Sequence, residues 1–221
     1  MRWGLRVLVA ALGLQIALVA LLGVVNPATD YYMLTEKIRL GSIRHEWVPL
    51  ADLPAAVPRA AVAAEDANFC QHWGFDLAAI RAVVVAGGKR LRGASTISQQ
   101  VAKNVFLWPS RSWLRKAFEV ETTLLLELLW SKRRILEVYL NMAEFDDGVF
   151  GVGAAAPWYF GVPARALTLQ QASRLAAVLP NPKGRSAKNP DARTRKRARA
   201  IADGARTIAA DGRDRCFRVL K

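Results

Sequence analysis

The longest uninterrupted apolar stretch of this 221-residue chain lies at its amino terminus. Val7 to Val25 runs for about 19 residues with Gln15 as its one strongly polar member, which is enough to cross a hydrocarbon core of roughly 30 Å. A cleaved signal peptide and a buried core helix are the alternatives. A signal peptide usually has a shorter apolar region, about 7–15 residues, and ends at a pair of small residues that is missing here. We therefore expect a retained anchor.

The charges that flank this stretch predict its orientation. Arg2 and Arg6 precede it without an acidic residue, which places the amino terminus in the cytoplasm and the rest of the chain outside. The expected organisation is a cytoplasmic tail (1–6), a transmembrane anchor (7–25), a connecting region (26–54) and one compact domain (55–221).

The pattern beyond residue 54 predicts helices almost throughout. Apolar residues recur at three- and four-residue spacing, N-capping residues precede these segments, and glycine or proline follows them. No segment alternates like a strand, so we expect an all-α domain. The expected helices are Pro58–Asp66, a segment from Asp76 to Gly87-Gly88, one opened by Ser95 and Thr96 with Gln99 as capping-box partner, Trp113–Trp130, Lys132–Met142 after Ser131, Thr168–Pro180 with Gln171 as capping-box partner, and a basic helix from Asn189-Pro190.

The net charge of +14 indicates a polyanionic partner or surface. Residues 183–221 carry 13 Lys or Arg against 4 Asp or Glu, although a solvated helical face explains such a run equally well. Anionic lipid and pyrophosphate substrates remain as partners, because nucleic acid is not an ordinary substrate outside the membrane.

Cysteine and histidine are too sparse to indicate a structural metal or a disulfide framework. Cys70 and Cys216 could pair in an extracytoplasmic domain, but spacing does not bring them together, and we expect both to be unpaired. His45 and His72 are the only histidines, so no zinc-site spacing exists.

Two adjacent acids end the alanine-rich helix. Carboxylates near a helix carboxy terminus oppose its dipole, at a cost of roughly 0.3–1 kcal/mol each, so solvation is a weak explanation for both. Side chains at i and i+1 diverge on a helix. We expect one of Glu65 and Asp66 to do chemistry while the other holds the following loop.

A basic, glycine-containing loop then runs into a helix start rich in hydroxyl groups, at residues 92–104. Free backbone N–H groups and the positive end of the helix dipole make this an anion site. Gln100, Lys103 and Asn104 share one face, although a solvated surface helix is the ordinary alternative. Further on, Arg115 and Glu119 form either a surface ion pair or a partly buried carboxylate beside cations.

Together these stretches resemble the motifs of glycosyltransferase family 51, the peptidoglycan glycosyltransferase module of class A penicillin-binding proteins and monofunctional transglycosylases. Five motifs in the family's order span roughly residues 55–185. They are matched by Glu65, Asp66, Phe69, His72 and Gly74; by Gly93, Ser95, Thr96, Gln99, Gln100, Lys103 and Asn104; by Arg115, Lys116 and Glu119; by Ile135–Asn141 with Gly148 and Gly151; and by Leu175–Pro182.

The resemblance implies a lysozyme-like helical domain that polymerises lipid II. The acceptor's 4-hydroxyl attacks the donor's anomeric carbon with inversion to a β-1,4 link, and polyprenyl pyrophosphate leaves. Glu65 would be the general base, Lys103 and Arg115 would receive the pyrophosphate, and Glu119 would hold those cations or help to ligate a divalent Mg²⁺ or Mn²⁺ ion. The other residues that the resemblance assigns to the substrate site are Asp66, Phe69, His72, Ser95, Thr96, Gln100, Asn104 and Lys116.

The segment between the second and third motifs mixes aromatic and cationic residues, which is typical of a membrane interface. We expect Phe106, Leu107, Trp108 and Trp113 to enter the bilayer, with a buried hairpin core as the alternative.

The expected enzyme is monofunctional, without a transpeptidase domain or an organic cofactor, and sits in the bacterial inner membrane. Its expected partners are lipid II, the growing lipid-linked glycan, the bilayer and proteins of cell division or wall synthesis. Two other functions fit parts of the pattern. A lysozyme-like hydrolase also uses an active glutamate, but as a protonated acid and without a pyrophosphate cluster. A membrane-tethered basic scaffold would rest on the charged carboxy-terminal segment alone.

Overall fold

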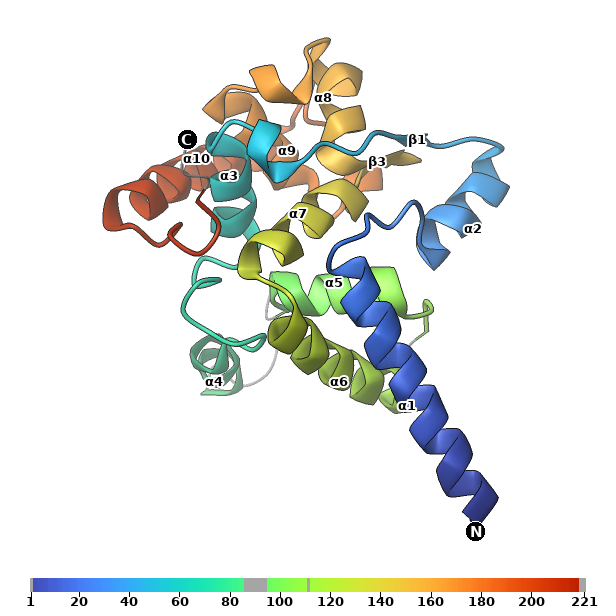
Figure 1. Cartoon of the computed structure of the whole chain (residues 1–221). Helices are drawn as coiled ribbons and strands as arrows, with labels where there is room; N and C mark the ends of the chain where they lie inside the picture. Colours follow the sequence, from blue (N-terminus) through green and yellow to red (C-terminus); the bar gives the residue numbers. More distant parts are fainter. Residues whose placement is uncertain (1, 86–94, 111, 219–221) are drawn as a thin grey trace.

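The computed structural model describes residues 2–85, 95–110 and 112–218, and the chain is mainly helical (Figure 1). Gly87-Gly88 and Gly93, which the sequence placed at a helix end and in the anion-binding loop, lie outside these residues. The helices are α1 (Arg2–Leu22), α2 (Tyr31–Leu40), α3 (Ala56–Glu65), α4 (Leu77–Val85), α5 (Ile97–Phe106), α6 (Trp113–Leu129), α7 (Lys132–Met142), α8 (Gly151–Phe160), α9 (Leu169–Val178) and α10 (Ala192–Asp211), with three 3₁₀ turns, η1 (Leu50–Asp52), η2 (Ala164–Ala166) and η3 (Pro182–Gly184).

Helix α1 projects away from the domain and is compatible with a single-pass membrane anchor (Figure 1). Its window Trp3–Leu22 has a mean hydropathy of 2.4, and only 6% of it is buried. Its inner half contacts α6, where the Gln15 amide donates to the Glu121 carboxylate at 2.6 Å. The Trp130 indole donates to the Val19 carbonyl at 2.7 Å, so the helix is fixed to the domain at two levels.

The core surrounds α7, which lies at the centre of the domain (Figure 1) and packs against α3, α5 and α8. Its residues Ile135, Leu136 and Val138 are fully buried. Helices α3, α9 and α10 pack on one another as a second group. The carboxy-terminal end of α3 therefore lies where the two groups meet.

The expected helix starts are largely confirmed. Thr96 forms a capping box at α5, Thr168 forms one at α9, and the Ser131 side chain caps α7. The basic helix instead begins after Asp191, whose carboxylate accepts from the Thr194 N–H at 2.6 Å, because an aspartate cap outcompetes the earlier Asn-Pro signal.

The domain is mainly helical, as expected, but it also contains a short sheet that the sequence did not predict. A three-stranded sheet has the order β1 (Arg44–His45), β3 (Val149–Phe150), β2 (Glu144–Asp146), with β1 parallel and β2 antiparallel to β3. Strands of two or three residues are too short to show alternation in a sequence. The turn between β2 and β3 depends on Gly148, whose φ of +71° lies in the left-handed region that favours glycine.

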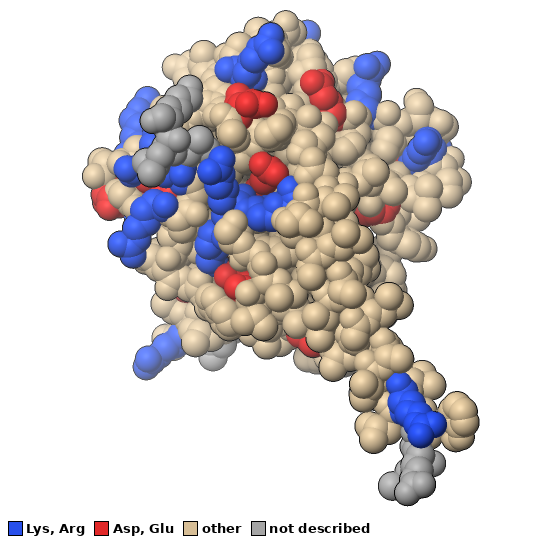
Figure 2. Space-filling model, viewed as in Figure 1, with Lys and Arg blue, Asp and Glu red and all other residues tan. Residues whose placement is uncertain are grey.

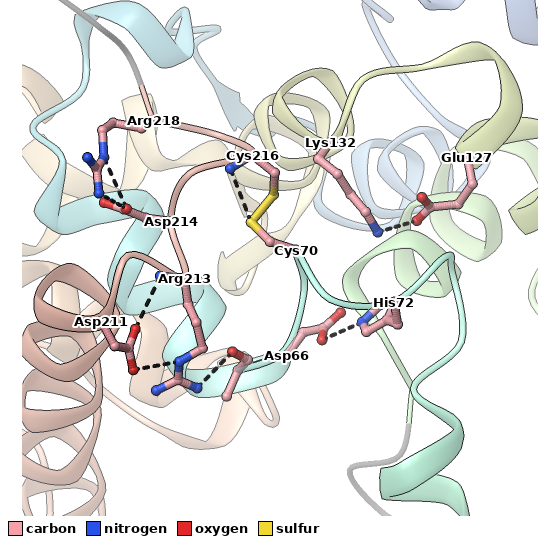
Figure 3. The surroundings of a disulfide bond; sticks show 11 residues. Asp66, Cys70, His72, Glu127, Lys132, Asp211, Arg213, Asp214, Cys216 and Arg218 are labelled. Atoms are coloured by element: carbon pink, nitrogen blue, oxygen red, sulfur yellow. Dashed lines mark hydrogen bonds and ion pairs between the residues drawn. A yellow bond between two sulfur atoms is a disulfide. The ribbon is translucent and has the colours of Figure 1, made fainter.

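The expectation that the cysteines are unpaired is wrong. Cys70 and Cys216 form a disulfide that joins positions 146 residues apart (Figure 3). Cys70 lies in the loop after α3, and Cys216 follows α10. Nearby, the Arg213 guanidinium donates to the Ala67 carbonyl at 3.2 Å. The carboxy-terminal segment thus braces the loop that follows Glu65, a contact between distant segments that spacing alone could not reveal.

Breaking this disulfide should destabilise the domain. Cys216→Ser is expected to lower the free energy of unfolding by about 2–4 kcal/mol, because the bond closes a long loop and restricts the unfolded chain. Thermal unfolding with and without reductant measures the effect. Reductant should lower the melting temperature of the wild type and leave the variant unchanged; titratable thiols in the unreduced wild type would contradict the bond.

Candidate active site

A half-buried carboxylate lies at the last residue of α3. The Glu65 side chain is 15% exposed, and one of its oxygens accepts a hydrogen bond from the Gln100 amide of α5 at 3.2 Å. The other oxygen lies 3.3 Å from the Arg197 guanidinium of α10. Burial raises the pKa of Glu65, while the Gln100 hydrogen bond and the charges of Arg197 and Arg185 act in the opposite direction. Three helices therefore set the charge state of this group.

The neighbouring acid points elsewhere, as the helix geometry predicted. Asp66 is 7% exposed, and one oxygen accepts from the Ile97 N–H at 3.0 Å, at the first residue of α5. Its other oxygen lies 2.8 Å from Nε2 of His72 (Figure 3). A carboxylate at a helix amino terminus is favoured by the helix dipole. Asp66 thus fixes the position of α5 relative to α3.

Four residues expected in the substrate site lie inside the domain: Asp66, Phe69, His72 and Thr96. Phe69 is fully buried, packs edge-on against His72, and has the Lys132 ammonium 4.4 Å from its ring centre. The Thr96 hydroxyl is buried and donates to the Gly74 carbonyl at 2.6 Å. Phe69 and Thr96 are buried in the packing next to the site, and the sequence-based assignment of both to substrate contact stays a prediction.

The face of α5 that carries Gln100, Lys103 and Asn104 borders a continuous groove. Two adjoining hollows of about 480 and about 330 Å³ share Tyr32, Lys103 and Asn104 in their walls. The larger one extends to Trp108 and Arg115. The smaller one extends past Gln100 to Tyr139, Glu144, Asn181 and Lys183. The groove therefore includes Gln100, the hydrogen-bond partner of Glu65, and extends to Trp108 in the segment after α5.

Cations gather where the two hollows meet. Desolvation by the surrounding atoms lowers the pKa of Lys103, and the charges of Arg115 and Lys116 lower it further, while Glu119 opposes them. Glu119 is 3% exposed and pairs with the Arg115 guanidinium at 2.9 Å and the Lys116 ammonium at 2.5 Å. Of the two sequence interpretations, the buried carboxylate beside cations is correct. An anion in the groove would meet positive charges that are already held in place.

The described residues do not offer Glu119 as a metal ligand in this arrangement. Both of its oxygens already accept hydrogen bonds from cationic side chains. Glu36, Glu144 and Asp147 also approach one another, with oxygens within 4.8 Å. The Lys183 ammonium lies 2.8 Å from Glu36 and 3.2 Å from Asp147, so a cationic side chain already occupies that position.

Of the remaining predicted residues, Asn104 lines the groove, while Ser95 and Lys116 are not part of its walls. Asn104 lines both hollows, Lys116 keeps 44% of its side chain exposed, and Ser95 is exposed just before α5. Sequence reasoning missed Arg197, because it treated the basic carboxy-terminal segment as one surface. It also missed Tyr32 and Lys183, which belong to segments that the fold alone brings to the groove.

The residues expected at the membrane interface divide into two pairs. Trp108 is 42% exposed and Trp113 is 91% exposed. Leu107 is buried, and the partly buried Phe106 packs against Trp130 with ring centres 6.0 Å apart, so this pair faces the domain, and its entry into a bilayer stays a prediction. Phe106 and Leu107 end an amphipathic helix whose apolar face turns inward.

The exposed tryptophans adjoin a larger apolar surface on the side of α1. Leu114, Leu124 and Leu128 of α6 are exposed. Figure 2 shows Lys and Arg mostly over the upper part of this face, while the surface next to the projecting helix carries few charges. An exposed apolar patch of this kind, beside a helix that is long and apolar enough to cross a membrane, is typical of a membrane-contacting surface.

Removing the two tryptophans should weaken membrane binding. In a chain that begins at residue 26, Trp108→Ser with Trp113→Ser is expected to reduce binding to liposomes about tenfold or more, because each ring loses apolar burial. Liposome co-sedimentation measures this. The matched control is Trp158→Ser on α8, which is 48% exposed and should bind like the parent chain. Equal binding by the tryptophan pair variant would contradict the membrane surface.

Comparison with known proteins gives the class of enzyme to which this helical domain, with its half-buried acid and cation-lined groove, belongs. A family model described as Transglycosylase matches residues 33–206, so the chain belongs to the transglycosylase family. Its lysozyme-like helical fold class is thereby confirmed.

Three similar proteins carry the name biosynthetic peptidoglycan transglycosylase. The one from Jannaschia sp. (strain CCS1) is 52% identical over 216 residues, covering 98% of this chain and 90% of that protein. The one from Stutzerimonas stutzeri (strain A1501) is 48% identical over 211 residues, covering 92% and 87%. The one from Cronobacter sakazakii (strain ATCC BAA-894) is 44% identical over 220 residues, covering 96% and 91%.

Proposed function

We propose that this enzyme polymerises lipid II into the glycan strands of peptidoglycan. The acceptor's 4-hydroxyl attacks the anomeric carbon of the donor's N-acetylmuramic acid, the centre inverts to a β-1,4 link, and polyprenyl pyrophosphate leaves. The contact between Glu65 and Gln100 carries the proposal, because it ties a half-buried carboxylate to the wall of a cation-lined groove. The names of the relatives support the same reaction.

Glu65 acts as the general base in this proposal. A base must be ionised to accept the proton of the attacking hydroxyl, and it works best when its pKa lies near the working pH. Burial raises the pKa of Glu65 in that direction, while Arg197 and Gln100 favour the ionised form. A lysozyme-like hydrolase would use the same residue as a protonated acid, but it has no need for the cations along the groove.

Lys103 and Arg115 receive the pyrophosphate. The leaving group gains negative charge in the transition state, and cations positioned in advance stabilise that charge without reorganising. Glu119 holds Arg115 and Lys116 in place from the buried side, so it is a positioning residue. Ser95, Gln100 and Asn104 contact the sugars and phosphates, while Asp66, Phe69, His72 and Thr96 support them from within.

The enzyme works on the outer face of the bacterial cytoplasmic membrane in this proposal. Arg2 and Arg6, in the first two turns of α1, favour a cytoplasmic amino terminus. The Cys70–Cys216 disulfide supports an oxidising compartment for the domain. Residues 1–6, 7–25, 26–54 and 55–221 then serve as tail, anchor, connecting region and enzyme domain. Proteins of cell division or wall synthesis would meet the domain on that side.

Neutralising the proposed base should abolish polymerisation without unfolding the enzyme. Glu65→Gln is expected to lower the rate of lipid II polymerisation about 10²–10⁴-fold, the usual contribution of a general base. Gel analysis of labelled strands and thermal unfolding measure the two properties. Glu46→Gln, at an exposed position, is the matched control.

Two outcomes would count against the assignment. One is a wild-type enzyme that shortens finished peptidoglycan and leaves lipid II unpolymerised. The other is a folded Glu65→Gln variant with the full rate of polymerisation.

Removing the Arg197 charge should shift the pH dependence. Arg197 lowers the pKa of Glu65, so Arg197→Gln leaves that pKa higher. Because the base must be ionised, activity falls as the pH drops through this pKa, and the acidic limb of kcat/KM should move to higher pH. A pH profile of the variant measures the shift, with Arg193→Gln on the same helix as control. An unchanged or oppositely moved limb would argue against Glu65 as the base.

A further inference from the structure

A second groove, separate from the one beside Glu65, lies between α9 and α10. It has a volume of about 420 Å³ and a floor that includes the methyl groups of Ala198 and Ala202. Its walls carry four arginines and a single acidic residue, and the polar side chains that line it are Gln170, Arg174, Arg195, Arg199, Asp203 and Arg206.

The positive charge of this arginine groove is largely unneutralised within the described part of the chain. Asp203 pairs with Arg206 at 2.6 Å, and both side chains are highly exposed. Arg195 donates to the Pro190 carbonyl. Arg174 and Arg199 form no ion pair with an acidic side chain among the residues that the structure describes. Like charges four residues apart on a helix, such as Arg195 and Arg199, destabilise it slightly. An anionic ligand would reverse that cost.

The position of the groove argues against the bilayer as its anion. Helices α9 and α10 lie at the end of the domain away from α1, whose free end marks the membrane side (Figure 1). Along α10, successive residues turn by about 100°, so Arg197 points roughly opposite to Arg195 and Arg199. One flank of α10 therefore faces Glu65, and the other forms the arginine groove, about one helix diameter away.

We propose that the arginine groove binds the carboxylate groups of the peptides on the newly made glycan strand. The inference rests on the proposed function, which makes a peptide-bearing polymer next to this groove. A guanidinium group matches a carboxylate with two parallel hydrogen bonds, and the alanine floor accepts the small aliphatic parts of a peptide. A polymer held at the Glu65 site presents its side peptides at high effective concentration, so modest affinity is sufficient.

Direct binding of pre-made strands tests the proposal on the full chain in detergent. The probes are labelled uncrosslinked glycan strands with intact peptides and the same strands after enzymatic removal of the peptides. The wild type should bind intact strands more tightly, and the preference should weaken as salt rises. Arg174→Gln with Arg199→Gln should lose about tenfold of the affinity for intact strands and none for stripped strands, since two exposed charge pairs are removed.

The matched control is Arg165→Gln with Arg193→Gln, two exposed arginines outside the arginine groove, which should retain the preference. Equal binding of intact and stripped strands by the wild type would overturn the proposal, as would an unaffected Arg174/Arg199 variant. Tighter binding of a poly-glutamate peptide than of intact strands would also overturn it, in favour of an acidic protein segment. Lipid II polymerisation is assayed separately. Because the strands in the binding experiment are supplied ready-made, a failure of polymerisation would not change the measured strand binding.

Discussion

The candidate active site depends on the Asp66 carboxylate, which joins three segments of the chain. It follows the last residue of α3, accepts from the first N–H of α5, and lies against His72 in the next loop. With α5 held in this way, Gln100 comes within hydrogen-bonding distance of Glu65. Since an unpaired buried carboxylate is costly, the arrangement has one strongly preferred geometry. Two adjacent acids therefore have divided contacts, with Asp66 holding α5 in place and Glu65 accepting a hydrogen bond from Gln100 in the groove wall.

The same separation of support and surface recurs around Glu119. Its buried carboxylate offsets the charges of Arg115 and Lys116. The mutual repulsion among Lys103, Arg115 and Lys116 is thereby reduced, so these cations can lie close together. The groove they line ends at Trp108, beside the exposed apolar face of α6. A substrate with a lipid tail and a charged head would place its tail against the apolar face of α6 and its head in the cation-lined groove.

Helix α10 connects the chemistry to the rest of the surface. Its buried face packs on α9 and α3, its Arg197 approaches Glu65, and its opposite flank carries the arginine groove. The segment after α10 returns to the loop that follows Glu65 through Cys216 (Figure 3). A segment that the sequence presents as a simple basic tail thus braces the loop after Glu65, places a charge beside the proposed base and lines the arginine groove.

The sequence by itself determined the helical class, the apolar amino-terminal helix, the caps at Thr96, Thr168 and Ser131, and the divergence of Glu65 from Asp66, because each follows from spacing within a few residues. Only the tertiary structure decided the rest. The disulfide, the short sheet, the approach of Arg197 to Glu65 and the burial of Phe69 and Leu107 are contacts between segments far apart along the chain. Local periodicity shows which face of a helix is apolar, but the packing of the whole chain decides what that face meets.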